Sequence, residues 1–469
     1  MKTPLVKLLA LTALSISVNG CIPRIPAIPA TARVETPAQW HEHYPQTIQN
    51  IDAQWWTQLN DPVLNQLINK ALINNVDIAL AQARIQEALA LEHASRASLL
   101  PSINASGGTT RQKSLNAFGV ASITRVEQPT FQAAYELDIF GKNRNTFQAS
   151  RLSRQATEMA AAATRISVIT TTVKSYIILR ALDEKLNLLQ KTLNARQREL
   201  RIAESKANVG YTSQLELNQA QAEYAATLQQ IPVIQSSISQ QEHALSMLIG
   251  SDSRIIERGL SLSELHAPAI PAMLPSDLMK NRPDIVQSSL LLAASDANLA
   301  SAQAEFFPSV KISATFGRVF STAPIKEPVN IWSIGGSILA PIFEGGKIHA
   351  NFDLNVAKRN EAAWNYRKTV LTALKEVEDQ LSSSYHLQQQ EQALEMERAA
   401  LANALHHATN RYRSGYSPYL DVLDSQRNLL SVESQLIQSK ADYLNSQVSL
   451  YQALGGGWTI VKNLNINKP

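Results

Sequence analysis

The residues best suited to chemistry lie close together near the end of the chain, in the stretch YLDVLDSQR from Tyr419 to Arg427. On a helix, Asp421 and Asp424 stand three residues apart and share a face with Leu420 and Arg427. Neighbouring carboxylates repel each other, bind cations and can be held by an arginine partner. The alternative is a solvated helix start, where acidic side chains suit the helix dipole. The pattern therefore predicts either an acidic site or an ordinary helix start.

Other reactive residue types are not arranged for catalysis or metal binding. The sequence contains no GxSxG, HExxH, P-loop or dinucleotide-binding motif. His406 and His407 are adjacent, so on a helix they point to different faces and cannot chelate one ion together. Cys21 is the only cysteine, which excludes an intrachain disulfide and a thiolate metal cluster. We therefore expect no enzyme activity, no cofactor and no metal site.

The sequence is written twice, because segments about 205 residues apart match in register. Residues 208–222 read NVGYTSQLELNQAQA and residues 413–427 read RSGYSPYLDVLDSQR, which aligns Gly210 with Gly415. A duplication of this length predicts two structurally equivalent halves and a pseudo-symmetric fold.

Each half contains one long run without helix-breaking residues. No glycine or proline occurs between Gly141 and Gly210, or between Gly346 and Gly415, and both runs are rich in strong helix formers. At 1.5 Å per residue, each run predicts a helix of roughly 100 Å that ends at a glycine cap. Helices of that length suit a coiled-coil rod, a spacer or the wall of a long tube.

Shorter helices are expected around the two long ones. The pattern favours one helix from Asp61, a good cap, to Pro101. Helices over about 212–249 and 417–454 should follow the two glycine turns. In the first of these, Pro232 removes a backbone donor and should kink the helix about one turn earlier, near Leu228.

Between the helices the apolar period changes to two, which predicts strands. The alternation is clear over 130–140, 309–320 and 331–343, and weaker over 102–115. Each half therefore offers two strands of about 10–13 residues, the length that crosses a bilayer when tilted. Four strands cannot close a barrel. Either they form soluble hairpins, or several chains pool them, because open edges are not tolerated in lipid.

The N-terminus has the features of a secretory signal: two lysines, then an apolar stretch over 8–18 that is too short to span a membrane. The sequence VNGC at 18–21 resembles a bacterial lipobox, which predicts a lipid on Cys21; ordinary signal cleavage nearby is the alternative. Ile22 follows the cysteine, and no aspartate stands there to retain a lipoprotein in the inner membrane. The resemblance therefore points to the outer membrane.

Composition argues against a nucleic-acid partner. The net charge is only +4, without a long basic run. Charged residues are 17%, below the roughly 25% typical of soluble proteins. The polarity comes instead from Gln, Asn, Ser and Thr.

Several strings together resemble the TolC-like outer membrane efflux proteins, and among them the NodT-type lipoproteins that serve RND pumps. No single string is decisive, but in this order, over nearly the whole chain, they are specific. They are YELDIFGKNRN (135–145), NRPDIVQSS (281–289), EFFPSV (305–310), APIFEGGKI (340–348), RYRSGYSPYLDVLDSQRNLL (411–430) and LYQALGGGW (450–458).

The resemblance implies an α+β membrane channel. Three chains, each with two pseudo-symmetric repeats, would pool four strands apiece into a 12-stranded transmembrane β-barrel. Their coiled-coil hairpins would continue it as an α-helical barrel across the periplasm. The implied organisation is a signal peptide (1–20), a lipidated extended tail (21–60), a first efflux repeat (61–250), a linker (251–274), a second efflux repeat (275–455) and a C-terminal tail (456–469).

The resemblance also assigns roles to residues at the helix ends. The positions matching Leu420, Asp421 and Asp424 form the family's periplasmic gate, with those of Arg427 and Tyr412 beside them. In a threefold assembly each acid forms a ring around the axis. The latch arginine of some relatives is replaced here by a serine, at position 417. The turns that would dock an adaptor protein contain Gly210, Tyr211, Gly415 and Tyr416.

The function implied is that of a passive exit duct for drugs or other small toxic compounds. Its partners would be two further copies of the chain, a periplasmic adaptor protein, an inner-membrane RND transporter and the lipid of the outer membrane. Two alternatives remain open on the sequence: the exit duct of a type I secretion system, and a periplasmic coiled-coil lipoprotein with a structural role.

Overall fold

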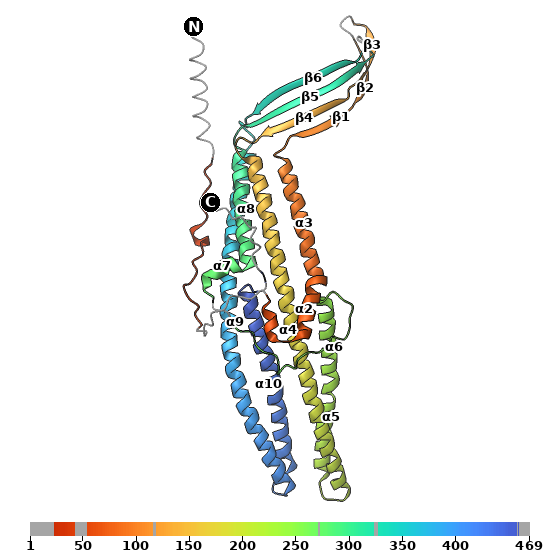
Figure 1. The fold of residues 1–469 in the computed structure, drawn as a ribbon, viewed down its shortest axis with the longest axis vertical. Coiled ribbons are helices and arrows are strands. Elements are labelled where there is room, and N and C mark those ends of the chain that lie inside the picture. The colour runs from red at the N-terminus through yellow and green to blue at the C-terminus, as the bar shows by residue number, and fades with distance from the viewer. Residues whose placement is uncertain are drawn as a thin grey trace. The chain divides into compact units, whose positions relative to one another are not determined.

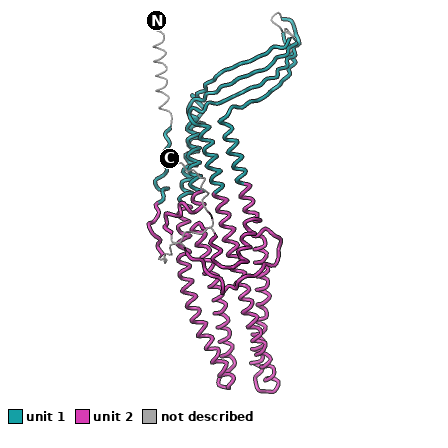
Figure 2. The backbone as a smooth tube through the Cα atoms, viewed as in Figure 1, with its two compact units in different colours: residues 1–34, 84–158, 287–368 teal, residues 35–83, 159–286, 369–469 magenta. Residues whose placement is uncertain are grey.

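The structure is a computed structural model that describes residues 23–42, 54–115, 119–270, 273–322, 327–456 and 458. The predicted signal peptide, Cys21 and nearly all of the predicted C-terminal tail lie outside the described residues. The chain divides into two compact units, each drawn from both halves of the sequence (Figure 2). Unit 1 comprises residues 1–34, 84–158 and 287–368, and unit 2 comprises 35–83, 159–286 and 369–469.

The two long helices dominate the chain (Figure 1), and each has 67 residues, as predicted. A break at Gln229 separates α5 from α6, which confirms the kink predicted near Leu228. Short 3₁₀ helices cover Ala30–Ala32, Trp55–Leu59 and Pro275–Asp277. The α-helices are α2 (Pro62–Asn74), α3 (Val76–Ala97), α4 (Lys142–Asn208), α5 (Gln214–Leu228), α6 (Gln230–Leu248), α7 (Leu278–Asn281), α8 (Pro283–Ala304), α9 (Lys347–Arg413) and α10 (Tyr419–Ala453).

Both long helices end in the same glycine turn. Gly210 after α4 has a φ of 78° and Gly415 after α9 has a φ of 79°, a left-handed conformation that favours glycine. The N–H of the residue after Gly210 donates to the carbonyl of Lys206 at 2.8 Å, and the one after Gly415 donates to that of Arg411 at 2.9 Å. These six-to-one bonds close a Schellman motif. The predicted caps are confirmed.

The single helix expected from Asp61 to Pro101 is wrong, because the chain breaks between α2 and α3. Asn75 is extended there, with a ψ of 132°. Its side-chain oxygen accepts from the N–H groups of Asp77 at 2.9 Å and Ile78 at 3.2 Å, so it caps α3. The apolar pattern continues across the break and therefore gave no sign of it.

The end of the predicted extended tail is also wrong. Residues Trp55–Leu59 form a 3₁₀ helix, and the side chains of Trp55 and Leu59 are completely buried in unit 2. The indole of Trp55 stacks on the ring of Tyr451, with the centroids 4.9 Å apart. Burial of large aromatic surface outweighs the polar composition of the neighbouring residues.

Unit 1 carries an antiparallel sheet in which neighbouring strands follow the chain. Ser106 faces Thr130 and Thr109 faces Glu127, so β1 and β2 form one strand with no slip in register. The interruption lies at Pro129, which has no N–H to donate. The strand segments are β1 (Ser102–Ser106), β2 (Thr109–Leu115), β3 (Ala121–Glu127), β4 (Thr130–Leu137), β5 (Ser309–Ser321) and β6 (Val329–Leu339).

The strands expected over 130–140 and 309–320 are confirmed. The strand expected to end at 343 stops at Leu339, before Pro341. Residues 121–127 were not predicted, although β3 runs on in register from β4: Val126 and Thr130 face Ser321 and Gly317 of β5.

Small side chains and a few polar contacts hold the helices of unit 1 together. Buried alanines, among them Ala149 and Ala302, allow close packing of α4 and α8. The guanidinium of Arg154 on α4 bridges Glu92 on α3 and Glu158. Arg359 of α9 is buried and donates to the carbonyl of residue 26 at 2.7 Å. The N-terminal segment of this unit is therefore tied to α9.

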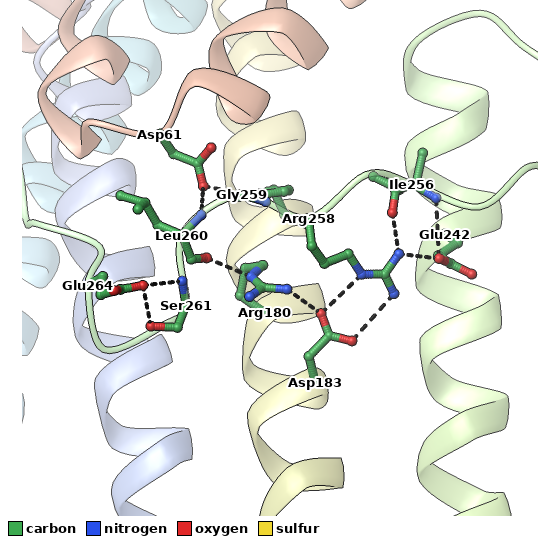
Figure 3. A network of polar contacts seen from close by, with 11 residues as sticks. Asp61, Arg180, Asp183, Glu242, Ile256, Arg258, Gly259, Leu260, Ser261 and Glu264 are labelled. Carbon is green, nitrogen blue, oxygen red and sulfur yellow. Dashed lines mark hydrogen bonds and ion pairs between the residues drawn. The ribbon is translucent and has the colours of Figure 1, made fainter.

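In unit 2 the N-cap of α2 is also the centre of a buried polar cluster (Figure 3). The carboxylate of Asp61 accepts from the N–H of Val63 at 2.8 Å, from the Tyr176 hydroxyl at 2.8 Å and from the N–H of Leu260 at 2.9 Å. A Cβ on Gly259 would lie 2.1 Å from Asp61. Burial raises the pKa of the Tyr176 hydroxyl, and its bond to Asp61 raises it further. Tyr176 therefore stays a donor.

The segment after α6, expected as a linker over 251–274, is bonded to the helices beside it (Figure 3). The guanidinium of Arg258 contacts Asp183 on α4 at 3.1 Å and Glu242 on α6. Arg180 donates to Asp183 at 2.6 Å and to the carbonyl of Leu260 at 2.7 Å. These bonds fix the segment against α4 and α6.

Two glycines at the ends of α6 and α10 sit against backbone. A Cβ on Gly250 would lie 2.3 Å from the carbonyl oxygen of Asn74, and one on Gly455 would lie 2.3 Å from that of Asn281. Both glycines have positive φ angles, 67° and 81°. Each therefore closes a helix over the turn that precedes another helix, α3 or α8.

Candidate functional site

The predicted site lies where two helix pairs end in unit 2. Helices α4 and α5 meet at the turn of Gly210, and α9 and α10 meet at the turn of Gly415 (Figure 1). A small apolar cluster joins the two pairs. Its buried members are Ala203 of α4, Ala220 of α5, and Tyr419, Val422 and Leu423 of α10. The four helix ends therefore pack as one tip.

The predicted gate residues share the exposed face of α10. Leu420, Asp421, Asp424 and Arg427 are all exposed, whereas Tyr419 between α4 and α10 is buried. Asp424 and Arg427 are 3.6 Å apart, so the structure brings these two together. Among the described residues, no ion pair forms with Asp421. The spacing read from the sequence thus gives one acidic face that borders a cation.

Arg427 makes its stronger contact across the helix pairs. Its Nε donates to Oε1 of Glu223 on α5 at 2.8 Å. The other carboxylate oxygen, Oε2, lies 2.8 Å from Nη1 of Arg196 on α4. Glu223 is only 7% exposed, and Arg196 is buried as well. Two guanidiniums on one carboxylate offset the cost of burying it. The bond to Glu223 is also the main cause that raises the pKa of Arg427.

Tyr412 forms a second bridge between the pairs. It lies in the last turn of α9, and its hydroxyl donates to the carboxylate of Glu216 on α5. The ammonium of Lys206 lies 4.8 Å from the centre of the Tyr412 ring, on which it acts as a cation on an aromatic face. Burial raises the pKa of the Tyr412 hydroxyl, and the bond to Glu216 raises it further. The donor is therefore kept at all physiological pH values.

Glu199 of α4 is the acid of the tip whose charge is least compensated. Gln426 donates to its Oε1 at 2.6 Å, while Oε2 is buried and has no hydrogen-bond partner among the described residues. Burial raises the pKa of the Glu199 carboxyl, and the bond from Gln426 and nearby arginines only partly oppose this.

We expect Glu199→Gln to change how the stability of the protein depends on pH. Because the folded-state pKa is raised, the folded chain binds the proton more tightly than the unfolded one, whose pKa is about 4.3. Stability from this group therefore rises as pH falls through the raised value, and is lost towards neutral pH. Glu199→Gln should be more stable than the wild type at neutral pH and lack this rise. Thermal unfolding at both pH values measures the effect.

The matched control is Glu204→Gln, which removes an exposed acid from the same helix. It should keep the pH dependence of the wild type. If Glu199→Gln and the wild type respond alike to acid, Glu199 is not the buried acid of the tip.

The sequence did not identify Glu223, Arg196 or Glu199 as part of the site. Their contacts join residues far apart along the chain, and no local pattern reports such a contact. One signal was available: Glu216 and Glu223 lie seven residues apart on α5, on the same side of that helix.

The turn residues predicted to dock a partner are highly exposed. Tyr211 is 84% exposed and Tyr416 is 79% exposed, at the end of each helix pair. Large aromatic side chains are rarely left in water without a reason. The described residues contain no group of three or more His, Cys, Asp or Glu that could hold a metal ion. None of the described helices is long and apolar enough to cross a membrane.

Paired long helices and an antiparallel sheet, with a tip of charged residues, define a class of efflux ducts and not of enzymes. The family model of outer membrane efflux proteins matches residues 67–251 and 274–456, most of the chain. The chain belongs to this family.

Curated relatives match nearly end to end. The chain is 30% identical to the probable efflux pump outer membrane protein TtgC of Pseudomonas putida, over 96% of each protein. It is 30% identical to the cation efflux system protein CusC of Escherichia coli, over 87% of this chain and 89% of CusC. It is 29% identical to the probable outer membrane lipoprotein SilC of Salmonella typhimurium, over 87% of this chain and 88% of SilC.

Solved structures share the fold. A crystal structure of CusC, described with the formation of its transmembrane channel, superposes with a TM-score of 0.83 at 28% identity, over 93% of this chain and all of CusC. The outer membrane channel CmeC of Campylobacter jejuni superposes with a TM-score of 0.82 at 26% identity, over 93% of this chain and 94% of CmeC. The mixed helix and strand content of this chain is that of these channels.

Proposed function

We propose that this chain is the outer-membrane exit duct of a tripartite efflux pump of the RND type, and that it acts as a homotrimer. Its relatives TtgC and CusC are named as outer membrane or efflux components. The observation that carries the proposal is the sheet, whose two faces differ as lipid-facing and water-facing surfaces must.

One face of the sheet is an exposed apolar band. Phe131, Phe316 and Trp332 stand side by side across three strands, and Trp332 is 77% exposed. The row that contains Leu137 and Ile338 lies six residues away, so the band is roughly 20 Å tall. Membrane barrels have an apolar belt of about 25 Å, bounded by aromatic residues. This face therefore suits lipid.

The opposite face is polar. Gln132, Thr315 and Ser333 stand side by side on it, and Ser313 follows two residues further along β5. Side chains that can bond to water in this way suit the inside of a pore. Each strand of the sheet thus alternates between a lipid side and a water side.

The edges of the sheet require further chains. Among the described residues, β6 pairs only with β5, and β1 pairs only with β4. Unpaired backbone groups in lipid cost several kcal/mol each, so both edges must find partners. Three copies that join edge to edge would close a 12-stranded barrel. The equivalent turns at Gly250 and Gly455, and at Gly210 and Gly415, support two efflux repeats in each chain, over 61–250 and 275–455.

The same threefold axis turns the helix ends into a gate. Asp421 and Asp424 would each appear three times around the pore, where carboxylate rings hold cations and narrow the path. The Arg427–Glu223 and Tyr412–Glu216 bonds hold α9 and α10 against α5. An adaptor that engages the exposed Tyr211 and Tyr416 turns would release these bonds and open the duct. An inner-membrane transporter would supply the energy.

We further propose that Cys21 carries the lipid anchor. The relative SilC is named as an outer membrane lipoprotein. The cargo would be drugs or other small toxic compounds, since efflux of this class is what the relatives TtgC and CusC are named for.

Planar-bilayer conductance tests the pore and the gate together. The purified wild type should pass a small current, and Asp421→Ala/Asp424→Ala should pass a current several-fold larger, because the carboxylate rings are gone. The control is Glu395→Ala/Glu397→Ala, which removes two exposed acids of α9 and should leave the current small.

Each remaining outcome has a definite reading. Large and equal currents from the wild type and the acid variant would keep the duct and reject the acidic gate. A protein that conducts in no form and stays soluble without detergent would reject the duct and favour a structural rod.

A further inference from the structure

The hairpin end of the sheet carries a cluster of cations on the same face as the apolar band. Arg111, Lys113 and Arg125 lie on this face, and so does Glu127. They are all the charged residues of β2 and β3. Arg318 of β5 joins them, with its guanidinium 6.0 Å from the centre of the Phe320 ring. We name Arg111, Lys113, Arg125 and Arg318 the basic belt.

The register places two of these cations against each other. Arg111 is the direct cross-strand partner of Arg125, so their Cβ atoms are about 5 Å apart. Like charges in that position are unfavourable unless an anion lies between them. Glu127 pairs with Arg125 at 2.6 Å. Among the salt bridges of the described residues, none reaches Arg111, Lys113 or Arg318.

The belt begins where the apolar band ends. Arg318 follows Phe316 by two residues on the same face of β5, and Phe316 belongs to the aromatic row of the band. Arginine side chains placed just beyond an apolar belt reach the headgroup layer of a membrane. A guanidinium binds a phosphate through two parallel bonds, which gives both strength and orientation.

The connections of the strands fix which side of the membrane the belt faces. The helix-side ends of the sheet lie at Ser102, Leu137, Ser309 and Leu339, which lead to α3, α4, α8 and α9. The belt lies toward the opposite end, where the hairpins are. Because the helices of an exit duct stand in the periplasm, the belt meets the outer leaflet. This step rests on the proposed function.

We propose that the basic belt binds the phosphates of the outer-leaflet glycolipid, lipid A, from the lipid side of the sheet. The outer leaflet of such a membrane consists mainly of this phosphorylated glycolipid. The net positive charge of the belt complements it, and the belt is continuous with the lipid-facing band. One phosphate lies between Arg111 and Arg125 and relieves their repulsion.

The test measures lipid A retained by the full-length protein in detergent. Native mass spectrometry would count the bound molecules after addition of lipid A with both phosphates, lipid A without phosphates, or phosphatidylglycerol. The wild type should retain the phosphorylated form several-fold more than either other lipid. Arg111→Gln/Arg125→Gln should lose that preference.

The matched control is Lys311→Gln, which removes a cation from the opposite face of the same sheet, where Lys311 lies 3.5 Å from Glu136. It should bind lipid A like the wild type. If the double variant does not fold, Arg111→Gln alone should still weaken the preference.

Conductance separates failure of the belt from failure of the duct. A belt variant that conducts like the wild type and retains as much lipid A would overturn the belt alone. Equal retention of phosphatidylglycerol and lipid A by the wild type would also overturn it. A wild type that neither conducts nor needs detergent would overturn the proposed function.

Discussion

Arg427→Ala should open the duct, seen as a several-fold rise in bilayer conductance over the wild type at neutral pH. The substitution removes the bond from α10 to Glu223 and the 3.6 Å contact with Asp424. Arg196 still pairs with Glu223, so no carboxylate is left buried and alone. A half-exposed ion pair contributes up to about 1 kcal/mol, which alters a closed–open equilibrium roughly fivefold. In a trimer three such losses act together.

Arg398→Ala is the matched control for this gate. Arg398 is an exposed arginine of α9, and its pair, Glu395 at 2.9 Å, lies on the same helix. Its removal costs the same charge but no bond between helix pairs, so conductance should stay at the wild-type level. A similar rise in both variants would show that net charge, and not the Arg427–Glu223 bond, keeps the duct closed.

Gly455→Ala should have the largest effect on stability. A Cβ there would lie 2.3 Å from the carbonyl oxygen of Asn281, a backbone atom that cannot move aside alone. The φ of 81° adds strain. We expect a loss of about 3–5 kcal/mol, in the range of severe core substitutions. The temperature at which the helical circular dichroism signal is lost would fall accordingly.

Gly415→Ala separates the two causes of that loss. Gly415 has nearly the same φ, 79°, and also closes a helix, but nothing lies within 4 Å of its Cβ position. Only the left-handed backbone is penalised, at about 1 kcal/mol. If Gly415→Ala and Gly455→Ala were equally damaging, backbone strain and not contact with Asn281 would explain both.

What the sequence predicted well was set by local chemistry. The long helices followed from the absence of glycine and proline between Gly141 and Gly210, and their caps from the glycine that ends each run. The exposed face of Asp421, Asp424 and Arg427 followed from helical spacing alone. Each of these features depends on residues within a few turns of one another.

What the sequence missed depends on distant residues or on an unusual surface. The break at Asn75 comes with a glycine from the end of α6 that packs on the preceding carbonyl. The Arg196–Glu223–Arg427 bridge joins three helices. Residues 121–127 form a strand whose outer face carries cations as well as apolar residues, so the apolar alternation used to find strands is weak there.

Both bridges at the tip end on the same helix. Tyr412 of α9 and Arg427 of α10 each bond to an acid of α5, Glu216 or Glu223. In the language of binding, this acidic strip is a receptor already occupied by an internal ligand at high effective concentration. An adaptor need not pull the helices apart. It can open the duct by competition, because donors offered to Glu216 and Glu223 displace Tyr412 and Arg427 by exchange.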